Sequence, residues 1–147
     1  KERIPVKASI AYSYFFVINH IAHEEDLITA FNFIRHNCNE TAKFFVDIYN
    51  DDLVKVDPPK NYRRENHGVV KSADVTRDEA GYRIKYSVDD KNIGEKIDSE
   101  IFVRGWSRTF IENTFNGVIT RNFDLNWCEI MATDCNYQYI VEITPNG

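Results

Sequence analysis

The sequence lacks any long apolar run. The longest one, residues 10–21, is interrupted by Ser13, Asn19 and His20, whereas a membrane-spanning helix needs about 20 mostly apolar residues. The sequence also lacks an excess of positive charge, because the formal net charge is −5 and both signs are interspersed along the chain. A protein that binds nucleic acid usually presents a basic patch to the phosphates. We therefore predict no membrane span in this chain and no nucleic-acid partner.

Cysteine is scarce and shows no C-x-x-C spacing. There are three, Cys38, Cys128 and Cys135, and an odd number leaves at least one without a partner in the same chain. Cys128 and Cys135 could close a short loop, which would favour a periplasmic or extracellular location. The first residue is Lys1 instead of methionine, so the removal of a signal or anchor is compatible with the sequence. The localisation and the disulfide state stay open.

Sequence motifs for catalysis and cofactor binding are also missing. No G-x-G-x-x-G, P-loop or G-x-S-x-G pattern occurs. The H-x-x-H-E-E cluster at residues 20–25 supplies too few ligands for zinc, which needs three or four that converge, so we interpret it as a polar turn. The sequence thus predicts no cofactor, no metal and no catalytic residue. It favours a protein that is not an enzyme.

Leucine is rare, with three residues against many isoleucine, valine, phenylalanine and tyrosine residues. These β-branched and aromatic side chains suit a pleated sheet. Residues 82–88 alternate strictly between apolar and polar after a turn at 78–81, which predicts a hairpin with residues 69–76. Residues 137–144 also alternate and predict a last strand, which Pro145 ends.

Residues 24–50 fit two structures. Apolar side chains recur at three- and four-residue steps behind an acidic start, which indicates an amphipathic helix, but the second half also alternates like a strand. We predict a helix over about 24–37 and a strand over about 41–49, while helix and strand both stay open for this region. Residues 51–67 are predicted to form an exposed loop. The predicted fold is a single domain over residues 1–147 of the α+β class, dominated by β: a curved antiparallel sheet or small β-barrel with one helix, or alternatively an all-β barrel.

Residues 100–131 carry the strongest local signal in the sequence. Asn116 and Gly117 lie between two alternating runs, and both residues tolerate the positive φ that a type I′ hairpin turn requires. A turn at this point fixes the register and predicts one long antiparallel hairpin with aromatic and opposite-charge pairs on one face. Those pairs are Phe110 with Phe123, Trp106 with Trp127, Glu112 with Arg121, and Arg104 with Glu129.

The aromatic face of this hairpin is the predicted ligand site. Arg108 lies opposite Leu125 and is the one charge on that face without an opposite charge across the strands. An arginine among aromatic rings could bind an anionic, partly apolar ligand through hydrogen bonds and stacking. Alternatively, it covers aromatic surface or pairs with an acid from another strand. The predicted ligand-binding residues are Arg104, Trp106, Arg108, Phe110, Phe123 and Trp127.

These observations together predict a non-enzymatic binding or interaction domain. Its partner would be an amphipathic small molecule held on the aromatic sheet face, or another protein. One alternative is an extracytoplasmic assembly or sensory module of a secretion, pilus or membrane-regulatory complex. A second is a small cone-shaped α+β enzyme that uses an acidic residue or a histidine as general base. The identity of the ligand or partner and the oligomeric state stay open.

Overall fold

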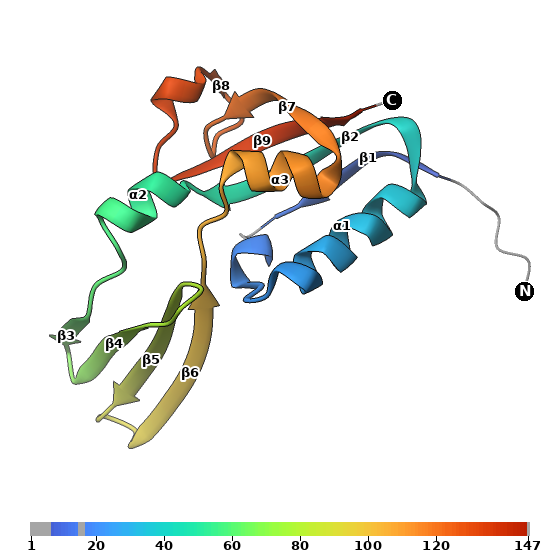
Figure 1. Cartoon of the computed structure of the whole chain (residues 1–147). Helices are drawn as coiled ribbons and strands as arrows, with labels where there is room; N and C mark the ends of the chain where they lie inside the picture. Colours follow the sequence, from blue (N-terminus) through green and yellow to red (C-terminus); the bar gives the residue numbers. More distant parts are fainter. Residues whose placement is uncertain (1–6, 15–16, 147) are drawn as a thin grey trace, which may run out of the picture.

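The computed structural model describes residues 7–14 and 17–146, which form two β-sheets and several helices (Figure 1). In chain order the elements are β1 (Ala8–Ser13), η1 (Val17–His20), α1 (Glu24–Asn37), β2 (Cys38–Tyr49), α2 (Asp51–Val56), β3 (Tyr62–Asn66), β4 (Val69–Arg77), β5 (Tyr82–Asp90), β6 (Glu95–Val103), α3 (Arg108–Phe115), β7 (Gly117–Phe123), β8 (Glu129–Ile130), η2 (Ala132–Asp134) and β9 (Gln138–Pro145). The larger sheet has the strand order β1–β2–β9–β7–β8, and the smaller sheet has the order β3–β4–β5–β6.

The larger sheet is mixed. Strands β1 and β2 are parallel, whereas β9 runs antiparallel to β2 and to β7. Parallel strands cannot be joined by a tight turn, so the chain crosses from β1 to β2 through η1 and the fourteen-residue helix α1. As a result, the carboxyl ends of β1 and β2 lie at the same end of the sheet.

The main core lies between this sheet and the helices α1 and α3, which cover one of its faces (Figure 1). Phe31 of α1, Phe44 of β2 and Phe115 of α3 are buried and form a three-ring cluster. The ring centroids lie 5.6 Å apart for Phe31 and Phe44, 5.6 Å for Phe31 and Phe115, and 5.2 Å for Phe44 and Phe115. Such aromatic contacts contribute beyond their buried area and fix both helices against the sheet.

The smaller sheet is an antiparallel meander inserted between β2 and α3. Its strands β4 and β5 pair along their whole length, from Val69 with Asp90 to Arg77 with Tyr82, which confirms the hairpin predicted over residues 69–88. One face carries a small apolar core of Ala73, Ile84 and Val103. The other face is polar, as expected for an antiparallel sheet with one solvated side.

Several elements were predicted correctly. The helix predicted over 24–37 is α1, the strand predicted over 41–49 lies within β2, and the last strand is β9. The loop predicted over 51–67 was wrong in part, because it contains α2 and β3. Asn50 caps α2 by accepting hydrogen bonds from two backbone N–H groups, which supports a short helix where few apolar residues occur.

The predicted fold class was wrong. The part of the chain that the structure describes forms no closed barrel, and the parallel pair of β1 and β2 does not fit a purely antiparallel sheet. The long hairpin over 100–131 was also wrong, since α3 occupies its first arm. Asn116 does adopt the positive φ expected from its sequence, at 53°, but it ends α3 instead of forming a hairpin turn. Gly117 then starts β7, where a Cβ would lie 2.6 Å from the carbonyl oxygen of Thr144.

A buried carboxylate stabilises the centre of the larger sheet. Glu142 of β9 is 2% exposed and accepts hydrogen bonds from the Nε of Arg121 at 2.9 Å and from the hydroxyl of Thr120 at 3.1 Å, with the Nζ of Lys43 at 3.0 Å. Burial raises the pKa of Glu142, but the hydrogen bonds from these three side chains outweigh it and lower the pKa overall. The charged form of Glu142 is therefore stabilised in the folded state.

The Glu142→Gln substitution is expected to cost roughly 1–2 kcal/mol at neutral pH, because hydrogen bonds to a charged group are lost. A carboxyl group with a lowered folded pKa stabilises the protein above its unfolded pKa of about 4.3, and this contribution disappears as the pH falls through the folded pKa. Urea unfolding between about pH 7 and pH 3 should therefore show a shallower acid loss for this variant. Glu40→Gln, at an exposed site, should keep the wild-type pH profile; equal profiles for all three proteins would contradict this role.

Candidate functional site

The carboxyl ends of β1 and β2 meet three other segments of the chain. The segment η1 follows β1, α2 follows β2, and residues 104–107 cross between them on the way from β6 to α3. The bridge between Asn50 and Trp106 ties this crossing segment to the end of β2. In sheets with parallel strands, ligands bind in the crevice at the carboxyl ends. We call this meeting point the junction.

Asn19 holds the junction together. Its side chain is 0% exposed, and its Oδ1 accepts a hydrogen bond from the backbone N–H of Tyr49 at 3.2 Å. Its Nδ2 donates to the carbonyl oxygen of Arg104 at 2.6 Å, and its own carbonyl accepts from the Arg104 N–H at 2.8 Å. One residue thus joins η1, β2 and the segment before α3.

His20, next to Asn19, is exposed and oriented by one hydrogen bond. Its Nδ1 lies 2.6 Å from the carbonyl oxygen of Phe102. A carbonyl can only accept, so Nδ1 carries the hydrogen, and in the neutral ring Nε2 holds the free lone pair. Nε2 makes no hydrogen bond to any residue that the structure describes. The junction therefore presents a histidine with a fixed tautomer and an available basic nitrogen.

Five of the six residues predicted to bind ligand fall into two groups. Trp106, Phe110 and Arg104 form the first group, beside the junction. The Trp106 ring stacks on Phe110 with centroids 4.9 Å apart, and the Arg104 guanidinium lies 3.8 Å above the Trp106 ring. The indole Nε1 of Trp106 donates to the carbonyl of Ile18 at 2.8 Å. These residues pack the junction, and Trp106 is buried.

The second group lies at the other side of the larger sheet. Trp127 is 46% exposed, and its ring contacts Phe123 at 5.9 Å and Phe45 at 5.7 Å. The predicted pairing of Trp106 with Trp127 was therefore wrong. The predicted pair of Arg104 with Glu129 was also wrong, since Arg104 binds Glu24 at 2.8 Å. Both pairings depended on the hairpin that α3 replaces.

Arg108 belongs to neither aromatic cluster. It is the first residue of α3, and its Nη1 donates to the Oδ1 of Asn122 at 2.5 Å. It lines a cavity together with Tyr139, Cys135 and Trp106. Of the four aromatic residues predicted around Arg108, Trp106 lines the same cavity, whereas Phe110, Phe123 and Trp127 do not.

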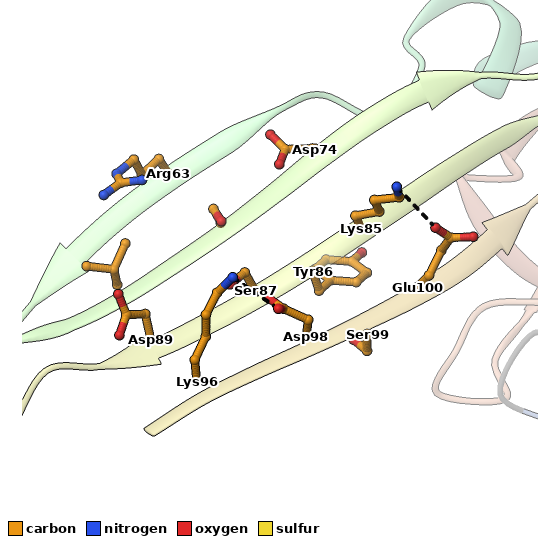
Figure 2. Close-up of a pocket in the computed structure, with 12 residues that line it drawn as sticks. Arg63, Asp74, Lys85, Tyr86, Ser87, Asp89, Lys96, Asp98, Ser99 and Glu100 are labelled. Carbon is orange, nitrogen blue, oxygen red and sulfur yellow. Dashed lines mark ion pairs between the residues drawn. The ribbon is translucent and has the colours of Figure 1, made fainter. Parts of the chain in front are cut away.

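A larger cleft of about 600 Å³ lies on the polar face of the four-stranded sheet (Figure 2). Lys85 pairs with Glu100 at 3.7 Å, and Lys96 pairs with Asp98 at 3.0 Å. Hydrogen bonds from Ser87 and Lys96 lower the pKa of Asp98. The cleft is lined by hydroxyl groups and by acidic and basic side chains, but its lining contains no histidine or cysteine. It is a polar surface without an evident nucleophile or base.

The remaining sequence-based expectations concern metals and thiols. Within residues 7–14 and 17–146 no group of histidine, cysteine and acidic side chains could hold a metal ion. Cys38, Cys128 and Cys135 are free thiols, so the loop that Cys128 and Cys135 could have closed is not formed. Burial raises the pKa of Cys38 and of Cys135, which disfavours the reactive thiolate.

The fold of this chain is similar to that of several solved S-adenosylmethionine-dependent methyltransferases. The sequence matches no family model, and a search of curated proteins finds no match. Among solved structures, a methyltransferase of this class from Clostridium acetobutylicum ATCC 824 matches 100% of this chain and 62% of its own, with a TM-score of 0.80 and 16% identity.

Two further structures share the fold. The CcbJ methyltransferase from Streptomyces caelestis matches 99% of this chain and 64% of its own, with a TM-score of 0.77 and 10% identity. CalS10, an amino pentose methyltransferase from Micromonospora echinaspora, solved with bound S-adenosylmethionine, matches 99% and 61%, with a TM-score of 0.66 and 10% identity. The chain therefore spans less than two thirds of each of these structures.

These matches correct the functional prediction. The prediction of a non-enzymatic binding domain is contradicted, because the solved structures that share the fold are methyltransferases. The periplasmic or extracellular location stays a prediction. A small-molecule partner agrees with the S-adenosylmethionine bound to CalS10. No helix among the described residues is long and apolar enough to cross a membrane, as predicted.

Proposed function

We propose that this chain forms the acceptor side of an S-adenosylmethionine-dependent methyltransferase. The observation that carries the proposal is the place of His20, which presents a free Nε2 at the end of η1, in a fold that solved methyltransferases share along the whole chain. The methyl acceptor would lie at the junction, against η1 and the segment before α3.

The residues of this chain do not by themselves fit S-adenosylmethionine. Folds that hold nucleotides on parallel strands commonly use a glycine-rich turn between a strand and a helix. The six glycines lie at residues 68, 81, 94, 105, 117 and 147, and none lies in the connections from β1 to α1 or from β2 to α2. More than a third of each matched structure also has no counterpart in this chain. The residues of this chain therefore account only for the chemistry at the methyl acceptor.

His20 supplies general-base chemistry at the junction. An amine or hydroxyl acceptor must give up a proton when it gains a methyl group, and Nε2 of a neutral histidine can take that proton. The Nδ1–H group keeps its hydrogen bond to the carbonyl of Phe102, so the ring stays oriented when it becomes charged. Asn19 fixes the backbone on which His20 lies. Proton removal then depends on the fold of η1 as well as on the imidazole.

Nuclear magnetic resonance on the full-length gene product tests the location of the site. S-adenosylhomocysteine, titrated as the probe, should shift the ring signals of His20 and the indole N–H signal of Trp106, which lie together at the junction. Lys85 and Asp98, in the cleft of the smaller sheet, should show no change and serve as internal controls. Shifts confined to that cleft, or no shifts at all, would contradict the proposal.

A further inference from the structure

A cavity of about 320 Å³ lies beside the junction, between α2, the first turn of α3, η2 and the start of β9. Residues 50–52 and 106–107 of the junction form one side of it, and the other side comes from Arg108, Thr109, Ala132, Cys135 and Tyr139. Ligand sites of small molecules typically occupy about 300–1,000 Å³, so this cavity suits a small ligand. It contains charged groups of both signs from separate elements.

Arg108 supplies the positive charge. Asn122 accepts a hydrogen bond from its Nη1, and Tyr139 lines the same cavity. Both of these neighbours are neutral and buried, with Tyr139 only 3% exposed. No carboxylate of residues 7–14 and 17–146 forms an ion pair with Arg108. The guanidinium has five N–H donors in a planar fork, so a fixed and unneutralised set of donors remains for a ligand.

Asp52 supplies the negative charge. It is exposed in the first turn of α2 and lies close enough to Tyr139 to influence that hydroxyl, as Arg108 does. It forms no ion pair with the residues that the structure describes, whereas its neighbour Asp51 is paired with Lys55 at 2.5 Å. Asp52 and Arg108 thus line one cavity with opposite charges, and they form no ion pair with each other.

We propose that this cavity binds a small zwitterion of the α-amino acid class, with its carboxylate on Arg108 and its ammonium group on Asp52. A planar carboxylate matches the guanidinium fork. A phosphate dianion fits less well, because two acidic side chains line the same small space. The inference goes beyond methyl transfer, and neither proposal requires the other.

Titration of the full-length gene product with three probes tests the zwitterion site, read by the indole signal of Trp106. L-alanine carries both charges, propionate carries only the carboxylate, and ethylamine carries only the ammonium group. L-alanine should bind more tightly than either of the others. Arg108→Gln should weaken L-alanine and propionate by about tenfold or more, as expected for lost hydrogen bonds to a charged group. Asp52→Asn should weaken L-alanine and leave propionate unchanged.

Matched variants separate charge recognition from damage to the fold. Arg83→Gln and Asp57→Asn alter the same residue types away from the cavity and should bind as the wild type does. Arg108→Lys keeps the charge without the fork and should give an intermediate affinity for propionate. The proposal is overturned if L-alanine binds no better than propionate, if it does not bind, or if Arg108→Gln and Arg83→Gln bind it equally.

Discussion

His20→Ala is expected to lower the rate of methyl transfer by about 10²–10⁴-fold, the usual contribution of a general base. The reason is geometric, since Nδ1 is held by the carbonyl of Phe102 and only Nε2 is left to accept a proton from the methyl acceptor. The measurement is the initial rate of S-adenosylhomocysteine formation by the full-length gene product. Added imidazole should restore part of the lost rate, because it replaces the missing base in solution.

His23→Ala is the matched control. His23 lies three residues away, is exposed, and makes no side-chain hydrogen bond as the cap of α1, so its loss should leave the rate unchanged. Circular dichroism should show the same folded content for both variants. Equal rates in the two variants, or a loss in His20→Ala that imidazole does not relieve, would rule out His20 as the base.

Asn19→Ala is expected to destabilise the protein by roughly 2–5 kcal/mol. The substitution leaves the N–H of Tyr49 and the carbonyl of Arg104 without their side-chain partner in a buried place, and each unsatisfied buried group costs about 1–3 kcal/mol. Asn19→Asp should also destabilise it, because a carboxylate can accept from Tyr49 but cannot donate to Arg104. Urea unfolding of each variant gives the free energy.

Asn37→Ala provides the comparison for this loss. The Asn37 amide also donates to a carbonyl, that of Phe33, but it lies on the exposed surface of α1. Substitutions at such sites usually change stability by less than about 0.5 kcal/mol. If Asn19→Ala were no more harmful than Asn37→Ala, the junction would not depend on Asn19.

The sequence patterns predicted correctly those helices and strands that pack against elements close to them in the sequence. The steps of three and four residues before Cys38 gave α1, and the strict alternation over 82–88 gave β5 and its pairing with β4. These patterns are visible because each element buries one face against a neighbour close in sequence. The parallel pairing of β1 with β2 is not local, and no turn residue indicates it.

The hairpin over 100–131 failed because one local signal fits two structures. Asn116 has positive φ both in a hairpin turn and at the end of a helix. The structure shows two features that stabilise the helix. The Ser107 hydroxyl accepts a hydrogen bond from the N–H of Phe110, and Ile111 and Phe115, four residues apart, are buried on one face. The alternation of Trp106, Arg108 and Phe110 is typical of a strand, but it continues only into the first turn of α3.

The proposed site at the junction could be predicted from the sequence only in part. Sequence patterns noted His20 as a member of a weak metal motif and singled out Arg108 for its charge. The contacts on which the proposed role of His20 depends join residues 82 to 88 positions apart, between η1 and the segment from Phe102 to Trp106. Spacing within one segment carries no information about such contacts. The buried role of Asn19 was invisible for the same reason.

Transfer of a labelled methyl group from S-adenosylmethionine is the measurement that tests the central claim most directly. The full-length gene product would be incubated with an amino sugar and with a free α-amino acid as acceptors, and the label would be followed by mass. We expect label in an acceptor nitrogen or oxygen, with one S-adenosylhomocysteine formed for each methyl group transferred. The absence of label from every acceptor, without formation of S-adenosylhomocysteine, would contradict the assignment.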